Sequence, residues 1–266
     1  MSCEHCATPP TESGNGWKSE FGRSEVRLRR LPAECFDAII TDPPYNAGAS
    51  GLLGRLQSSA AKYQNTSTAN KLPTIAGDSM LPDAWRLLMT MVAIECFRVA
   101  KPGSTLLSFC DWRSASELIS IWGAAGFQIR GLPVWDKGQG TRPQRNGFRS
   151  QTEFILWGRK PGKETRDKDV YLPGVFQCST KQTKKVHVTE KPVSLIDRLL
   201  EIVPPGGSVL DPFQGSGTTG VAAIARGLTY HGIEAVDEYF AVAVSRLREA
   251  EAAATETQNA GATAKT

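Results

Sequence analysis

The chain has 266 residues, of which 40% are hydrophobic, and this is enough to bury one substantial core. No apolar run approaches the ~20 residues that span a bilayer and the first residues lack an apolar secretory segment, so we expect a cytoplasmic protein without membrane contact. The net charge of +4 is too small to indicate a nucleic-acid partner by itself. The 6 cysteines are too scattered for a disulfide framework, and Cys3, His5 and Cys6 are at most half a zinc site, so no metal is expected.

Both ends of the chain have compositions that favour disorder. Residues 1–20 are rich in Ser, Thr, Pro and Gly, and residues 251–266 consist mostly of Ala, Thr, Gln, Asn and Gly. We therefore expect a disordered leader, a single domain over residues 21–250 and a disordered tail.

The first informative motif follows the apolar run of residues 36–40, which is typical of a buried strand. After one threonine come Asp42, Pro43, Pro44 and Tyr45. The prolines fix the backbone and present carbonyl groups without donating N–H groups. This loop suits a flat molecule with an NH2 group, because the amine hydrogens can go to Asp42 and a backbone carbonyl while Tyr45 covers the face of the ring.

Strand-like apolar runs alternate with stretches of helical spacing along the rest of the chain. This alternation predicts an α/β sheet wrapped by helices. The expected strands are residues 38–41, 105–109, 127–135, 153–157, 208–211 and 230–233, and the expected helices include 84–99, 114–125 and 193–202.

The second informative motif is a strand that ends at Asp211 and leads into a glycine turn and a helix. Small residues let the backbone approach a ligand, and the free N–H groups of a helix start can receive a carboxylate or phosphate. Gly215, Gly217 and Gly220 also fit the dinucleotide pattern G-x-G-x-x-G, and Glu234 follows at about the expected 20 residues. On the glycines alone, a nucleotide-binding Rossmann domain is therefore a serious alternative.

Together the two motifs resemble those of the S-adenosylmethionine-dependent DNA amino-methyltransferases. The family hallmark is Asp-Pro-Pro-Tyr, and residues 211–218 match its cofactor signature Asp-Pro-Phe-x-Gly-Ser-Gly-Thr throughout. The catalytic loop comes first and the cofactor loop last, which is similar to the circularly permuted β class. The resemblance covers about residues 28–247 and implies a Rossmann-like methyltransferase fold, with a mixed, mostly parallel sheet and helices on both faces.

The resemblance also implies the residues of the site and its cofactor, S-adenosyl-L-methionine. The catalytic residues it implies are Asp42, Pro43, Pro44 and Tyr45. The cofactor-binding residues it implies are Asp42, Lys191, Asp211, Pro212, Phe213, Gly215, Ser216, Gly217, Thr218 and Glu234.

Residues 140–188 hold clusters of lysine and arginine with few acids, a composition that by itself equally suits a solvated face. In the family this part of the chain is the target-recognition segment, so the resemblance implies double-stranded DNA as the partner. It also implies a homodimer encoded by a bacterium or a phage. Residues 46–77 form a long connection, which we expect to be mobile and to order over DNA.

The resemblance favours adenine N6 as the methylated atom, because family members that act on cytosine N4 more often carry serine at the position of Asp42. Cytosine N4 is the alternative within the family, and a catalytically silent DNA-binding module is the alternative from another class. One position departs from the pattern. The β class typically has an acid directly after a glycine, where this chain has Gly22 and Arg23, so the contact to the cofactor adenine is unassigned.

Overall fold

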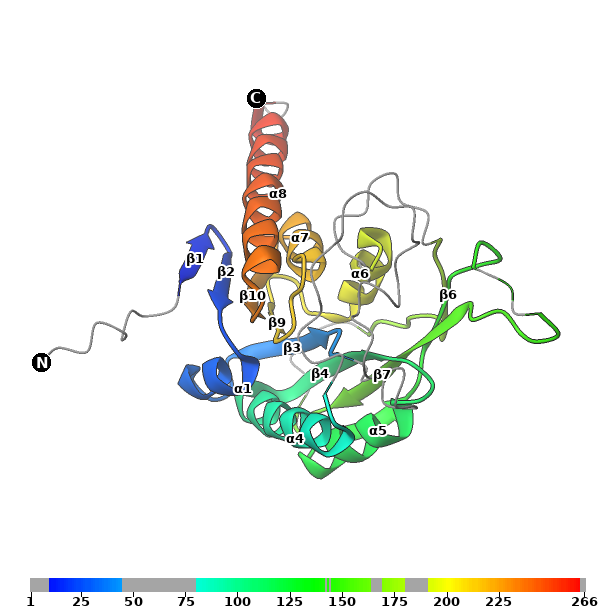
Figure 1. The fold of residues 1–266 in the computed structure, drawn as a ribbon. Helices are drawn as coiled ribbons and strands as arrows, with labels where there is room; N and C mark the ends of the chain where they lie inside the picture. The colour runs from blue at the N-terminus through cyan, green and yellow to red at the C-terminus, as the bar shows by residue number, and fades with distance from the viewer. Residues whose placement is uncertain are drawn as a thin grey trace, which may run out of the picture.

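The computed structural model of the chain describes residues 10–44, 80–141, 143, 145–163, 169–179 and 191–263 (Figure 1). Within these residues, one 10-stranded sheet has the order β1-β2-β10-β9-β3-β4-β7-β6-β8, and β5 also pairs with β7. The strands are β1 (Thr11–Gly14), β2 (Trp17–Phe21), β3 (Phe36–Thr41), β4 (Ala100–Cys110), β5 (Gln128–Gly131), β6 (Val134–Asp136), β7 (Thr152–Arg159), β8 (Val175–Gln177), β9 (Ser208–Asp211) and β10 (Thr229–Glu234).

The helices lie on both faces of this sheet. They are α1 (Ser24–Arg27), α4 (Pro82–Val99), α5 (Ala115–Ala124), α6 (Val193–Leu199), α7 (Thr218–Ala225) and α8 (Asp237–Thr263), with 3-10 turns η1 (Leu28–Arg30) and η2 (Leu200–Ile202). No helix in the described part of the chain is both long and apolar enough to cross a membrane.

Strand direction confirms the predicted mixed, mostly parallel sheet. The neighbours β2, β10, β9, β3 and β4 are all parallel, whereas β7 is antiparallel to β4. Because β6 is antiparallel to β7, β6 runs in the same direction as β3 and β4. The carboxyl ends of β3, β4, β6, β9 and β10 therefore lie along one edge of the sheet, where ligands of open α/β folds bind.

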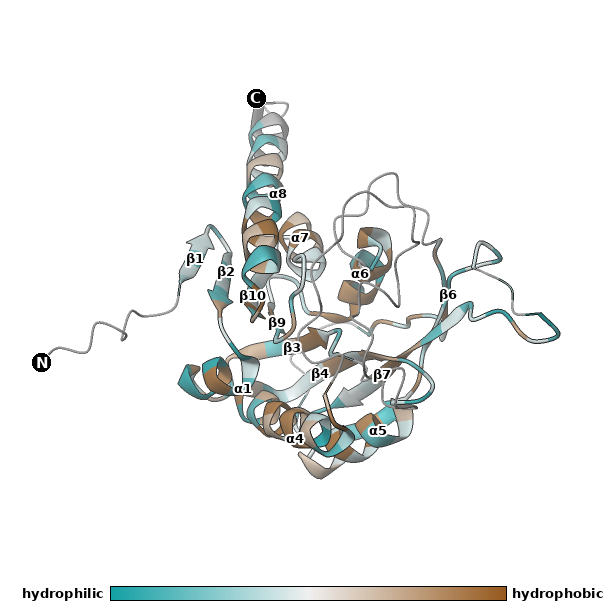
Figure 2. Cartoon of the chain, viewed as in Figure 1, coloured by the Kyte–Doolittle hydropathy of each residue, from teal (hydrophilic) through white to brown (hydrophobic). Residues whose placement is uncertain are grey.

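The core has one cluster on each face of the sheet. Successive residues of a strand point to opposite faces, so Ile40 packs with the side of α6, α7 and α8 whereas Ile39 packs with the side of α4 and α5. Every residue of β3 is buried, which explains why its sequence, apart from Asp37 and Thr41, is apolar on both faces rather than alternating. Figure 2 shows hydrophobic residues on the central strands and on the helices that flank them.

The expected disorder at the two ends is wrong for residues 11–20 and 251–263. The first of these ranges forms β1 and most of β2, and the second completes the long helix α8. The two ends hold each other, because Glu251 accepts hydrogen bonds from the Trp17 indole N–H (2.7 Å) and from the Asn15 backbone N–H (2.7 Å). The domain therefore begins before residue 21 and ends after residue 250.

The expected strand 127–135 is divided into β5 and β6. Pro133 lies between the two pieces and has no N–H group for the ladder, although its carbonyl still accepts a bond from the backbone N–H of Ile155 (2.8 Å). Strand β8 was not expected from the sequence. The expected mobile loop 46–77 lies outside the described residues, as do residues 1–9 and parts of 140–188.

Candidate active site

The two sequence motifs meet at the carboxyl edge of the sheet. Strands β3 and β9 are parallel neighbours, with Ala38 opposite Val209. At their ends the Thr41 hydroxyl donates a hydrogen bond to the Asp211 carboxylate (3.1 Å) across 170 residues of sequence. The loop that follows β3 and the glycine turn that follows β9 therefore form one site.

Helix α4 anchors the loop that begins with Asp42, Pro43 and Pro44. The indole N–H of Trp85, a fully buried residue, donates to the carbonyl of Pro44 (2.6 Å). Pro43 and Pro44 are themselves buried, so the start of this loop has a fixed position. Tyr45, the remaining catalytic prediction, lies outside the described residues. Trp85 was not predicted, because in the sequence it is one more apolar position of a helix.

Asp42 belongs to a chain of alternating charges. Its Oδ2 accepts a bond from the amine of Lys191 (2.5 Å), and the same amine lies 3.0 Å from Oε1 of Glu153. The other carboxylate oxygen of Glu153 lies 2.7 Å from the amine of Lys137. Each charge is compensated by the next, which is the condition for placing charges in a buried position.

Lys191 is the deepest member of this chain, with 7% of its side chain exposed. Burial lowers the pKa of a lysine, but the carboxylates of Asp42 and Glu153 outweigh burial, so its pKa is raised and the amine stays protonated. The amine also faces the ring of Phe109 at 5.0 Å. Lys191, predicted as a cofactor-binding residue, thus directly contacts Asp42, which is predicted to be catalytic.

Glu153 and Lys137 are site residues that the motifs did not reveal. Glu153 is 7% exposed and begins the apolar part of β7, and Lys137 directly follows β6. An acid at the start of an apolar run is unusual in a strand, so the sequence alone could have indicated Glu153. The sequence does not indicate its partner Lys137, because the contact depends on the pairing of Trp135 with Glu153 between the two strands.

The glycine turn after β9 is shaped by close packing. Gly217 has φ +79°, a conformation that favours glycine, and a Cβ added there would lie 3.1 Å from the Cβ of Ala243 on α8. Helix α8 also supplies Arg246, whose guanidinium donates to the backbone carbonyl (2.8 Å) and hydroxyl (2.8 Å) of Ser216. Among the predicted residues, Ser216 and Thr218 are both buried.

Two buried carboxyl groups lie on either side of this turn. Burial raises the pKa of Asp211 to about 7, although bonds from groups that include the Phe213 backbone N–H oppose the rise. Burial likewise raises the pKa of Glu234 to about 7, against hydrogen bonds from the backbone N–H groups of Val236, Gly215 and Ala235. Strongly shifted acids that cluster in this way are typical of functional sites.

The end of β2 and the start of α1 contact the end of β10 and the loop that follows β9. The backbone N–H of Gly22 donates to the carbonyl of Glu234 (2.7 Å), and the hydroxyl of Ser24 donates to the carbonyl of Pro212. Arg23, at the position where the family typically has an acid, is paired with Glu25 (2.6 Å) and is 71% exposed. The cofactor-loop prediction Pro212 is therefore held by the start of α1.

The sequence and the fold match those of known proteins, and these matches show the family of the chain. The N6/N4 methyltransferase family, described as DNA methylase, matches residues 36–245, which contain both motifs. The chain belongs to this DNA methylase family. It is 31% identical to YubD of Escherichia coli K12 over 221 residues, 83% of this chain and 85% of YubD. It is 30% identical to the type II methyltransferase M2.LlaDCHI of Lactococcus lactis subsp. cremoris over 251 residues, 84% of this chain and 86% of that protein.

Solved structures show the same fold for this DNA methylase. TTHA0409 of Thermus thermophilus, in its complex with S-adenosyl-L-methionine, superposes with a TM-score of 0.62. That comparison covers 87% of this chain and 94% of TTHA0409 at 21% sequence identity. The predicted Rossmann-like methyltransferase fold is thus confirmed.

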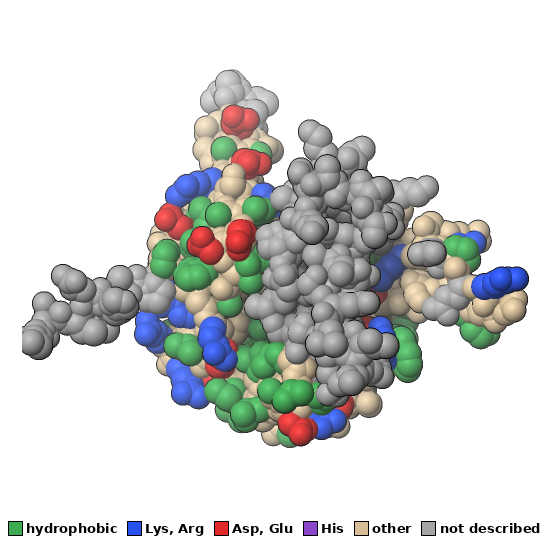
Figure 3. All heavy atoms as spheres, in the orientation of Figure 1, with side chains coloured by type: hydrophobic (Ala, Val, Ile, Leu, Met, Phe, Trp, Pro, Cys, Tyr) green, Lys and Arg blue, Asp and Glu red, His purple; other side chains and the backbone are tan. Residues whose placement is uncertain are grey.

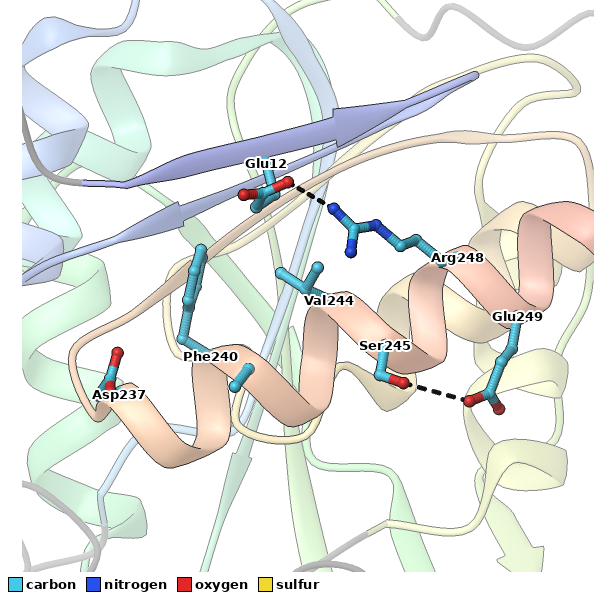
Figure 4. A pocket seen from close by; sticks show the side chains of 8 residues that line it. Glu12, Asp237, Phe240, Val244, Ser245, Arg248 and Glu249 are labelled. Carbon is cyan, nitrogen blue, oxygen red and sulfur yellow. Dashed lines mark hydrogen bonds and ion pairs between the residues drawn. The ribbon is translucent and has the colours of Figure 1, made fainter.

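A separate hollow of the methylase lies away from both motifs, between β1 and α8 (Figure 4). It has a volume of about 480 Å³ and is crossed by the ion pair of Arg248 with Glu12 (2.7 Å). The residues that line it are Glu12, Asp237, Phe240, Ala241, Val244, Ser245, Arg248 and Glu249. None of them is a predicted site residue, so this hollow is not the active site.

Proposed function

We propose that the protein transfers a methyl group from S-adenosyl-L-methionine to N6 of an adenine that is rotated out of duplex DNA. The observation that carries the proposal is the position of Asp42. Its carboxylate lies at the end of β3, beside the end of β9 where the cofactor turn begins. An acceptor for the base amine and a site for the methyl donor are then neighbours.

The residues present fit S-adenosyl-L-methionine. Gly215 and Gly217 have positive φ and let the cofactor approach the backbone, and Glu234 ends β10 with a carboxylate that can accept bonds from both ribose hydroxyls. The cofactor carries an ammonium and a sulfonium, and the carboxyl groups of Asp211 and Asp42 suit these positive charges. We assign to Lys191 the contact with the carboxylate of the methionine end.

The chemistry required of Asp42 follows from the electronic structure of adenine. The lone pair of the amino nitrogen is delocalised into the ring and is a poor nucleophile. Hydrogen bonds from the NH2 group to Asp42 and to the carbonyl of Pro43 favour a tetrahedral nitrogen with an available lone pair. A carboxylate has two oxygens with several acceptor positions, so Asp42 can hold Lys191 and the base amine at the same time.

Methyl transfer then balances in one displacement. The amino nitrogen forms a bond to the methyl carbon, the bond between carbon and sulfur breaks, and the electron pair stays on sulfur as a neutral thioether. The nitrogen becomes positive until it loses a proton to solvent, and the negative charge of Asp42 stabilises it during this step. S-adenosyl-L-methionine supplies the electrophilic methyl group, and no covalent intermediate with the protein is needed.

The base must leave the helix before this reaction, which costs a few kcal/mol. Stacking of the extruded base on Tyr45 would recover about 1 to 3 kcal/mol. The aspartate at the first position of the motif supports adenine over cytosine as that base.

The test is to incubate the purified protein with plasmid DNA and labelled S-adenosyl-L-methionine and to identify the methylated nucleoside by mass spectrometry. N6-methyladenine is the expected product. N4-methylcytosine would overturn the choice of base but keep the reaction, and no methylated nucleoside despite cofactor binding would indicate a silent DNA-binding module instead.

A further inference from the structure

The segment between β6 and β7, residues 137–151, projects from the body of the protein (Figure 1). We call it the arm. Since β6 runs in the same direction as β3, the arm leaves the sheet at the same edge as Asp42. In the space-filling view, hydrophobic and basic side chains lie together on this projecting part (Figure 3).

The arm is uniformly basic. Between Asp136 and Glu153 the sequence contains one lysine, three arginines and no acid. The acid before the arm is bonded to the arm itself, because Asp136 Oδ1 accepts bonds from the Gly138 backbone N–H (2.8 Å) and the Gln151 amide (3.1 Å). An electrostatic surface of this kind fits the phosphate backbone of nucleic acid.

An exposed aromatic ring lies near the end of the arm. Phe148 is 93% exposed and is flanked by Arg149 and by a turn in which Asn146 has φ +55°. Arg149 closes the arm by donating to the carbonyls of Gln139 (3.0 Å) and Thr141 (2.7 Å). A single exposed apolar residue is ordinary on a protein surface. An exposed ring on a basic projection is a different feature, because the ring can contact bases while the basic side chains contact phosphates of the same nucleic acid.

The root of the arm is connected to Asp42 through a chain of ion pairs. Lys137, its first residue, pairs with Glu153 at 2.7 Å, and Glu153 shares the amine of Lys191 with Asp42. Two intermediate side chains thus connect the arm to the carboxylate that would receive the target base. The position of the root of the arm relative to Asp42 is fixed by these contacts and by the strand pairing of β6 with β7.

We propose that Phe148 inserts between base pairs next to the target base and fills the gap that the extruded nucleotide leaves. The proposal rests on the proposed function, since it names how the same site gains access to a base. Apolar side chains that unstack neighbouring base pairs are a general device of DNA-distorting proteins. Here Arg145 and Arg149 would neutralise phosphates on either side of the ring.

Plasmid unwinding tests the insertion without knowledge of the recognition sequence. Plasmid is relaxed by topoisomerase I in the presence of the full-length protein, the protein is removed, and the linking number is compared by gel electrophoresis. The wild type should lower the linking number in proportion to the protein bound. Phe148→Ala should lose this effect, whereas Phe148→Leu, which keeps an apolar wedge, should retain most of it.

Tyr171→Ala is the matched control, because Tyr171 is an equally exposed ring (88%) that precedes the amino end of β8 rather than following a carboxyl end. It should unwind plasmid like the wild type. Equal unwinding by Phe148→Ala, loss of unwinding in Tyr171→Ala, or no unwinding by the wild type would each overturn the proposal. Methyl transfer to the same plasmid is assayed in parallel, so unwinding without methylation would refute the proposed function and leave the insertion standing.

Discussion

Replacing Asp211 by asparagine should stabilise the protein at alkaline pH. Burial raises the pKa of Asp211 from 3.8 to about 7, which amounts to about 4 kcal/mol at ~1.4 kcal/mol for each pH unit. Because the folded-state pKa is the higher one, the folded protein holds the proton more tightly. Its stability therefore falls as pH rises from about 4 to about 7 and is constant above that range.

The magnitude follows from this window. At pH 8 the wild type bears the whole cost of ionising Asp211, about 4 kcal/mol, whereas at pH 5 it bears less than half of it. Asparagine has the same shape and does not titrate, and any change it makes to the hydrogen bonds with Thr41 and Phe213 is the same at both pH values. Relative to the wild type, the variant should gain about 3 kcal/mol on going from pH 5 to pH 8.

Urea unfolding of both proteins at the two pH values measures this difference. Asp37→Asn on the adjacent strand is the matched control, because Asp37 is also buried but its bonds from Lys101 (2.8 Å) and Ser208 (2.8 Å) outweigh burial and lower its pKa. Asp37 contributes stability above its ordinary pKa of 3.8, so that variant should lose the same stability at pH 5 as at pH 8. If Asp211→Asn shows the same stability difference at both pH values, the reasoning is refuted.

Three further predictions concern side-chain contacts between distant parts of the chain. Glu153→Gln removes the charge of a carboxylate that shares the Lys191 amine with Asp42. Steady-state kinetics should show kcat lowered by about 10-fold with the KM for DNA unchanged, and an equal loss of kcat in Glu153→Asp would argue for packing alone. Arg246→Gln should weaken S-adenosylmethionine binding by about 10-fold in calorimetry, since the arginine holds the cofactor turn, and unchanged binding would contradict that role. Glu251→Gln should lower unfolding free energy by about 1 kcal/mol without altering kcat, which an unshifted thermal midpoint would disprove.

Site residues could be predicted from the sequence where they belong to a motif of consecutive residues. Asp42 and Asp211 each end an apolar strand and begin a loop of unusual composition, so both could be predicted, and the structure places their strands side by side. The homodimer stays a prediction. The roles of Tyr45 and of the loop over DNA also stay predictions.

Contacts between distant elements could not be predicted in the same way. Trp85 and Arg246 look in the sequence like ordinary helix positions, and they reach the site only because α4 and α8 pack beside it. The ends of the chain illustrate the same limit. Composition favoured disorder there, but Ala has high helix propensity, and the contact of Trp17 with Glu251 joins segments 234 residues apart.

Single-turnover methyl transfer by Asp42→Asn is the decisive measurement of whether the Asp42 carboxylate accepts the base amine. The rate of transfer to plasmid DNA should fall by about 100-fold or more, because an amide cannot stabilise the positive nitrogen, while DNA affinity should change little. Lys191→Met, measured in parallel, should weaken cofactor binding, since Lys191 is proposed to contact the methionine carboxylate. A rate near that of the wild type in Asp42→Asn would contradict the assignment of Asp42 as the acceptor of the base amine.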